Sequence, residues 1–326
     1  MPEHTQTDAH GGGHGTRAVV AALLANLGIA VAKFVGFTLT GSSSMLAEAF
    51  HSVADSGNQA VLLGGGRLAR RQPDETHQFG HGSTRFFAAF LVAVVLFTLG
   101  ALFSFYEGFD KLRHPHELES PIIAIGILLV AIVLEGFSLR TAVNESVPFK
   151  GEQSWWSFIR TTKKPELAVV LLEDTAALLG LVFALVGICL AAVTHDPVYD
   201  ALGTLAIGAL LAVVAVVLAI EMHSLLIGEA ASPPEQRAIR EAITSTPGIA
   251  NLVHLRTRYL SPDELLVVGS IEMDPSLSAS QVPVAIDDAE ARLRKVVPGA
   301  RVVYLEPEVP AGAGSSPAAQ EYPTET

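Results

Sequence analysis

The sequence is poor in the residues on which soluble enzymes and secreted domains depend. Only 17% of its 326 residues are charged, whereas an average soluble domain carries about 25%. The single cysteine, Cys189, excludes a disulfide framework and any metal site built on paired cysteines. The net charge of −12 argues against a nucleic-acid-binding protein, because the surfaces that bind nucleic acids are basic. Half of the residues are hydrophobic, and they gather in long runs.

These runs predict an integral membrane protein made of helices. A transmembrane helix needs about 20 consecutive, mostly apolar residues. Residues 1–16 are polar and contain His and Gly, so we expect a disordered tail and no signal peptide. Residues 17–228 predict a six-helix transmembrane domain. Its spans are expected near 17–39, 45–68, 85–106, 121–143, 166–190 and 198–221.

Basic residues are distributed unequally between the two sides of the membrane. The loop between spans 3 and 4 holds Lys111 and Arg113. The other side holds Arg67, Arg70, Arg71, Arg85, Arg140, Lys150, Arg160, Lys163 and Lys164. Because basic loops stay on the cytoplasmic side, both termini are expected in the cytoplasm. A bacterial inner membrane is the expected location, and an organelle membrane stays open.

After Gly228 the pattern changes from long apolar runs to short alternating segments. The segments predict a small α+β domain over residues 229–308, on the cytoplasmic side. Its expected order is helix, strand, strand, helix, strand, over residues 233–245, 250–260, 264–274, 278–297 and 300–308. Residues 309–326 are rich in Pro, Ala, Gly and Ser and predict a second disordered tail.

Ionisable residues interrupt the second apolar segment, in "AEAFHSVADSGNQ" at 47–59. An Asp or Lys at the centre of a transmembrane helix costs about 2.5–3.5 kcal/mol, so such residues mark functional sites. His51 and Asp55 are four residues apart and therefore share one helix face, with Glu48 on the same side. The fifth segment carries Glu173 and Asp174.

An imidazole with carboxylates is a ligand set that suits Zn²⁺ and its neighbours. We predict a metal site of His51, Asp55 and Asp174, with a fourth ligand from Glu173, water or Asn26. Adjacent helical residues point about 100° apart, so Glu173 and Asp174 need not face the same site. The alternative is a hydrogen-bond network between helices that holds no ion.

Three further ionisable residues of the apolar segments are interpreted individually. Lys33 and Glu135 are candidates for an ion pair or a proton route. Asp200, near the outer end of the sixth segment, is interpreted as an interfacial or capping residue.

Four stretches together resemble the cation diffusion facilitator family, whose members export zinc and other divalent metals in exchange for protons. These stretches are "GSSSMLAEAFHSVADSGNQ" (41–59), "QPDETHQFGHG" (72–82), "HDPVYDALGTLAIG" (195–208) and "HLRTRYL" (254–260). The resemblance covers residues from about 17 to 308. The version "LLEDTAALLG" (171–180) is similar to the branch that includes mitochondrial-type zinc transporters.

The resemblance implies a transport site in which His51 and Asp55 are joined by a histidine and an aspartate of the fifth span. Asp174 matches the aspartate, but Val170 stands where the histidine is expected, so the fourth ligand and the metal stay open. Asp74 and His81, with His77 between them, match a loop metal site of some bacterial members. The alternative is a loop ordered for packing and dimer contact.

The resemblance also implies metal-binding histidines in the cytoplasmic domain, but Ser270 and Tyr304 stand at expected ligand positions. His254, Glu272 and Glu306 are only nearby, so we expect no complete binuclear site.

The expected function is proton-coupled efflux of divalent metal, with Zn²⁺ first and Mn²⁺, Fe²⁺ or Co²⁺ as alternatives. A non-transporting metal-binding regulator is a further alternative. We expect no enzyme, because no HExxH motif is present. The expected partners are divalent metal ions, protons, membrane lipids and a second copy of the chain, with no resident cofactor and no nucleic acid.

Overall fold

A computed structural model describes residues 27–115 and 120–308. The chain divides into two compact units, Met1–Leu226 and Ile227–Thr326, and each is described by itself. The predicted tails, 1–16 and 309–326, and the residue Asn26 lie outside the described residues.

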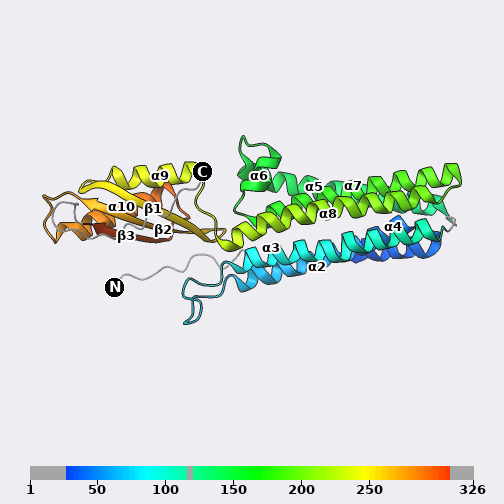
Figure 1. The fold of residues 1–326 in the computed structure, drawn as a ribbon, viewed down its shortest axis with the longest axis horizontal. Helices are drawn as coiled ribbons and strands as arrows, with labels where there is room; N and C mark the ends of the chain where they lie inside the picture. Colours follow the sequence, from blue (N-terminus) through cyan, green and yellow to red (C-terminus); the bar gives the residue numbers. More distant parts are fainter. Residues whose placement is uncertain (1–26, 116–119, 309–326) are drawn as a thin grey trace. The chain divides into compact units, whose positions relative to one another are not determined.

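The first unit is entirely helical in its described part (Figure 1). A helix Leu27–Thr40 comes first. The elements that follow are α2 (Ser43–Leu68), α3 (Thr84–Val95), the π-helical segment η1 (Leu96–Leu102), α4 (Phe103–Arg113), α5 (Pro121–Lys150), the short α6 (Trp155–Thr161), α7 (Pro165–Thr194) and α8 (Val198–Ile227). The segments α3, η1 and α4 follow one another without a break, over Thr84–Arg113.

Four helices of the described chain are long and apolar enough to cross a membrane: Thr84–Arg113, Pro121–Lys150, Pro165–Thr194 and Val198–Ile227. Helix α2 has 26 residues, but its polar residues set it apart from these four. The first helix is described only from Leu27 onward. The count of six spans therefore stays a prediction.

Local sequence explains where several helices begin and end. The Ser42 hydroxyl accepts a hydrogen bond from the Met45 amide and caps α2. Helices α5 and α7 each begin with a proline. Proline lacks an amide hydrogen, and this costs nothing at the start of a helix, where amides have no partner within the helix. Gly151, with φ of 57°, ends α5. Helix α5 reaches Lys150, seven residues beyond the predicted end of that span at 143, because its last two turns mix polar and apolar residues and give a weak hydropathy signal.

The second unit has the predicted order of elements: α9 (Pro233–Thr244), β1 (Ile249–Ser261), β2 (Glu264–Met273), α10 (Gln281–Val296) and β3 (Val302–Glu308). The sheet order is β1-β2-β3. Strands β1 and β2 pair antiparallel, and β2 and β3 pair parallel across the connection through α10. The buried core of this unit includes Ile239, Leu265, Val267, Ile271 and Leu293.

Candidate metal sites

One face of α2 carries a buried row of polar side chains. His51 is 1% exposed, Asp55 8%, and Glu48 and Asn58 are fully buried. Their spacing of three or four residues places them on one side of the helix. This confirms the common face that the sequence predicts for His51 and Asp55, whose Nδ1 and Oδ1 atoms lie 3.6 Å apart.

Helix α7 presents Glu173 to this row. The Asn58 amide Nδ2 donates a hydrogen bond of 2.9 Å to Glu173 Oε1. The carboxyl groups of Asp55 and Glu173 also lie close enough to interact. His51 thus lies against Asp55, and Asn58 lies against Glu173, on facing sides of α2 and α7. The ligand atoms of His51, Asp55 and Glu173 do not all lie within 4.8 Å of one another in this described part of the chain.

Asp174 faces elsewhere. It accepts a hydrogen bond of 2.8 Å from the Ser138 hydroxyl of α5. Val170, one turn earlier, packs against the apolar cluster that contains Phe158 and Leu171. Since residues four apart share a helix face, Val170 and Asp174 lie on a face of α7 different from that of Glu173. The structure therefore does not gather Asp174 with His51 and Asp55.

Several buried atoms of this cluster have no hydrogen-bond partner among the described residues. Both ring nitrogens of His51 are without one, as are Asp55 Oδ1, Asn58 Oδ1, Gln59 Oε1 and Glu48 Oε1. An unsatisfied buried polar group costs about 1–3 kcal/mol, so such atoms call for an explanation such as an ion. A nitrogen and several oxygens, buried and free of competing bonds, are suited to a divalent cation.

A buried ion pair lies beside the cluster. Lys33 Nζ is 3.0 Å from Glu48 Oε2 and donates a hydrogen bond of 2.8 Å to the Ser52 hydroxyl. Of the two roles considered for Lys33 and Glu135, the structure pairs Lys33 with Glu48 of α2 in place of Glu135, and the proton route stays a prediction. Gly180 of α7 makes room for this arrangement, since a Cβ there would lie 2.6 Å from Glu48 Oε1.

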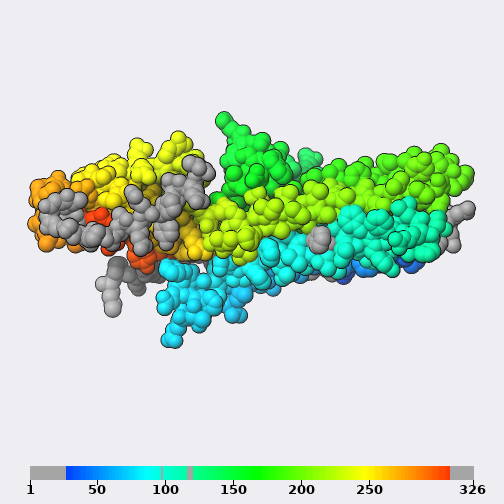
Figure 2. Space-filling model, in the orientation of Figure 1, coloured from blue at the N-terminus to red at the C-terminus, as the bar shows by residue number. Residues whose placement is uncertain are grey.

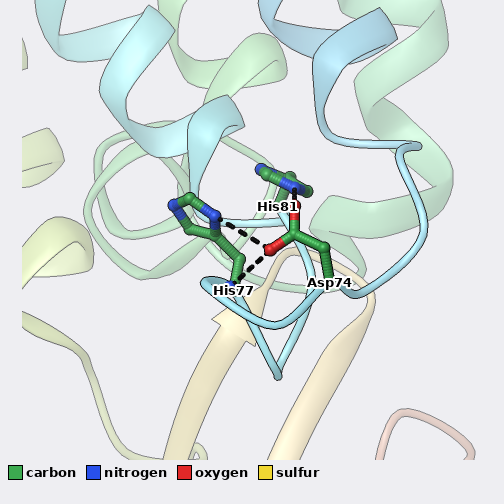
Figure 3. Close-up of side chains that lie close together, drawn as sticks. All are labelled: Asp74, His77 and His81. Atoms are coloured by element: carbon green, nitrogen blue, oxygen red, sulfur yellow. Dashed lines mark hydrogen bonds and ion pairs between the residues drawn. The ribbon is translucent and has the colours of Figure 1, made fainter.

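The second predicted site lies in the loop after α2 (Figure 3). Asp74 Oδ2 lies 3.1 Å from His81 Nε2, and Asp74 Oδ1 lies 3.4 Å from His77 Nδ1. Within the described chain, these three residues are the group of His, Cys, Asp or Glu whose ligand atoms all lie within 4.8 Å of one another. The structure thus brings the three predicted loop residues together.

Backbone hydrogen bonds fix the position of the Asp74 carboxylate in this loop. Asp74 Oδ1 accepts hydrogen bonds from the amides of Thr76 at 2.9 Å and His77 at 2.7 Å. The bond from the His77 amide, followed by weaker contributions that include His81, lowers the pKa of Asp74 to about 2. Gly80, with φ of 77°, supplies the left-handed turn that returns the chain to His81.

At the other end of the membrane unit, Asp200 of α8 caps α2. Its carboxylate accepts hydrogen bonds from the amides of Ser43 at 2.9 Å and Ser44 at 3.4 Å. Lys111 of α4 lies 3.0 Å from the same carboxylate. The capping interpretation of Asp200 is confirmed, although the capped helix is α2.

In the second unit, His254 of β1 lies opposite Ser270 of β2. The Ser270 hydroxyl donates a hydrogen bond to Glu308. Within residues 227–308 no three His, Cys, Asp or Glu side chains form a ligand group.

Comparison with known proteins identifies the family. Residues 19–227 match the family model "cation efflux transmembrane domain", and residues 231–308 match "cation efflux protein, cytoplasmic domain". The chain belongs to the cation diffusion facilitator family. It is therefore a membrane transport protein and not an enzyme.

Its relatives include mitochondrial and bacterial proteins. The mouse "Proton-coupled zinc antiporter SLC30A9, mitochondrial" is 33% identical over 245 residues, 74% of this chain and 43% of the relative. The "Cation-efflux pump FieF" of Pectobacterium atrosepticum is 29% identical over 299 residues, 91% of this chain and 93% of the relative. The chain spans less than half the length of the mitochondrial relatives. A solved MamM CTD structure covers 24% of this chain and 98% of that chain, at 22% identity and a TM-score of 0.23, too low to establish a common fold.

Proposed function

We propose that this protein exports divalent metal cations, Zn²⁺ first among them, in exchange for protons. The observation that carries the proposal is the buried row of His51, Asp55 and Asn58, whose unsatisfied atoms lie beside Glu173 inside a helical unit matched to cation efflux. The names of the mitochondrial relatives support zinc and proton coupling.

The donor set argues for zinc. Zn²⁺ binds imidazole nitrogen and carboxylate oxygen, commonly with four ligands. His51, Asp55 and Glu173 supply three, and Asn58 Oδ1 is the neighbouring unsatisfied oxygen. One specific observation favours Mn²⁺, Fe²⁺ or Co²⁺ as a second candidate. With Val170 in an apolar cluster, the site has one histidine and is rich in oxygen, which suits harder ions.

Protons and the metal compete for the same atoms. A ligand nitrogen or carboxylate binds the ion only when it is deprotonated, so metal binding releases protons and protonation releases metal. In the proposed cycle, the cluster takes the metal from the cytoplasm, opens to the other side, and returns with protons in its place. The Lys33–Glu48 ion pair lies beside the proposed ligands and neutralises Glu48, so that this carboxylate adds no net charge to the cluster.

The loop residues Asp74, His77 and His81 are proposed as a second metal site on the cytoplasmic side, where the ion is captured or sensed.

We place both termini in the cytoplasm, with a bacterial inner membrane as the host. We also propose that two copies of the chain pair through the cytoplasmic domain named in the family match.

The experiment is zinc flux into proteoliposomes under an imposed pH gradient. Asp55→Asn is compared with Asp110→Asn, a matched change at an exposed aspartate of α4 that contacts His114. Gradient-driven flux that is lost in the first variant and kept in the second supports the proposal. A regulator that binds metal without transport would show zinc binding and no flux in the wild type. Equal flux in both variants would contradict the assignment of the site.

A further inference from the structure

The connection between α5 and α7 holds both tryptophans of the sequence, Trp155 and Trp156, in helix α6. The Ser154 hydroxyl caps this helix by accepting a hydrogen bond from the Ser157 amide. One side chain, Phe158, is buried and packs with Ala142 of α5 and Leu171 of α7. Figure 1 shows α6 beside these two helices, and in Figure 2 the same segment protrudes from the helical unit. Helix α6 is thus fixed to two spans by one anchoring ring.

The anchor sets the depth of α6 in the membrane. Ala142 follows Pro121, the first residue of α5, by roughly 21 residues, or about 32 Å of helix. Leu171 precedes Thr194, the last residue of α7, by roughly 23 residues, or about 35 Å. The hydrocarbon core of a bilayer is about 30 Å thick. With Pro121 and Thr194 at the opposite boundary, both helices place Phe158 at the boundary between hydrocarbon and headgroups, on the side of the basic loops.

Apolar rings around this anchor are not covered by the described protein. Trp156 is 55% exposed, Phe149 52% and Trp155 38%. Exposed tryptophan rings are typical of the membrane interface, where their apolar body and polar N–H match the two sides of the boundary.

Cations are held over these same rings. Lys164 Nζ lies 3.7 Å from the centre of the Phe149 ring, and Lys150 Nζ lies 5.2 Å from that of a Trp155 ring. A cation–π contact holds an ammonium group without neutralising its charge. Arg160 is the basic residue of α6 that pairs with a carboxylate, Glu221 Oε1 at 3.1 Å. Residues 150–164 contain Lys150, Arg160, Lys163 and Lys164 but a single acidic residue, Glu152.

We propose that α6, with Phe149, Lys150 and Lys164, is a binding site for anionic phospholipid headgroups. The rings enter the boundary of the hydrocarbon, and the two ammonium groups meet the phosphates of lipids such as phosphatidylglycerol. The two ammonium groups at this depth are complementary in charge to anionic lipids of the leaflet that faces the basic loops. A soluble acidic partner would match the charges, but it would leave the rings at the hydrocarbon boundary unexplained. The proposal does not depend on which metal is transported.

The two tryptophans make the test direct, because all tryptophan fluorescence of the chain comes from α6. The full chain is reconstituted into vesicles of phosphatidylcholine and phosphatidylglycerol, with bromine on the acyl chains of one lipid or the other. Brominated phosphatidylglycerol is expected to quench the fluorescence more than brominated phosphatidylcholine, by about twofold at equal mole fraction. Lys150→Gln with Lys164→Gln should abolish this preference. The matched control, Arg70→Gln with Arg71→Gln, removes the same charge from exposed residues after α2 and should keep it.

Equal quenching by the two lipids in the wild type would overturn the proposal. So would a preference that survives the double lysine substitution in a protein of unchanged helicity. Quenching by aqueous acrylamide but by neither brominated lipid would place α6 outside the bilayer and would favour a soluble partner.

Discussion

The α2–α7 cluster and the loop after α2 contain the same residue types, histidine and carboxylate, but differ in burial and in the hydrogen bonds that these residues make. In the cluster, His51 and Asp55 are buried and keep unsatisfied atoms. In the loop, Asp74 is exposed and already bonded to two backbone amides. A site that must bind and release an ion at each cycle gains from ligands that have no other partner. A carboxylate that is held by its own backbone needs little rearrangement to bind an ion, which suits the capture or sensing role proposed for the loop.

The largest expected effect comes from the ion pair beside the cluster. Lys33→Met would leave Glu48 as an unpaired buried charge, and breaking a buried pair costs about 3–5 kcal/mol of folding free energy. We expect a large loss of thermal stability in detergent, with much of it recovered in Lys33→Met with Glu48→Gln. If the single and double variants were equally unstable, the pair would not be the cause.

Removing the imidazole of the cluster separates transport from stability. His51→Leu should lower zinc flux by about a hundredfold, since a metal ligand is lost. The same change should leave the metal-free protein equally or more stable, because it removes a buried ring with two unsatisfied nitrogens. Flux and thermal unfolding are measured on the same preparation. A destabilised metal-free variant would mean that His51 has structural partners.

A smaller effect is expected in the loop. Asp74→Ala should remove one equivalent of bound zinc and lower flux by less than about tenfold, because the cluster stays intact. Equilibrium dialysis gives the number of ions bound, and Glu75→Ala, a neighbouring exposed carboxylate, is the matched control. Loss of flux as complete as in His51→Leu would contradict the separation of the two sites.

The smallest expected effect is that of lowering the pH on the loop that contains Asp74. Because the folded pKa of Asp74 is about 2, below its ordinary value, the carboxylate stabilises the loop at pH values above about 4, and this contribution disappears as the pH falls through the folded pKa. Hydrogen-exchange protection of the Thr76 and His77 amides should therefore be the same near pH 7 and about pH 5. Loss of protection at the lower pH would show that the turn does not depend on the carboxylate alone.

The sequence predicted the elements whose signals are local. Helix α9 begins with proline and a Ser232–Glu235 capping box. The amphipathic pattern of residues 233–245 was sufficient to predict this helix. The loop group of Asp74, His77 and His81 was predicted from the family resemblance of residues 72–82, and the structure brings the three side chains together. The family resemblance was confirmed by the comparisons.

The parts that could not be predicted depend on helix rotation and on packing between distant segments. Glu173 and Asp174 are adjacent, and only the packing of α7 decides that Glu173 meets Asn58 while Asp174 meets Ser138. The partner of Lys33 depends in the same way on how the first helix faces α2. Helix α6 was missed because its seven residues are too few to show a period.

The central claim is that Glu173, and not Asp174, completes the transport site with His51 and Asp55. The most direct measurement is zinc flux into proteoliposomes under a pH gradient, with Glu173→Gln and Asp174→Asn side by side. The account predicts that flux is nearly lost in Glu173→Gln and reduced by less than about tenfold in Asp174→Asn. Loss of flux in Asp174→Asn with near-normal flux in Glu173→Gln would contradict it.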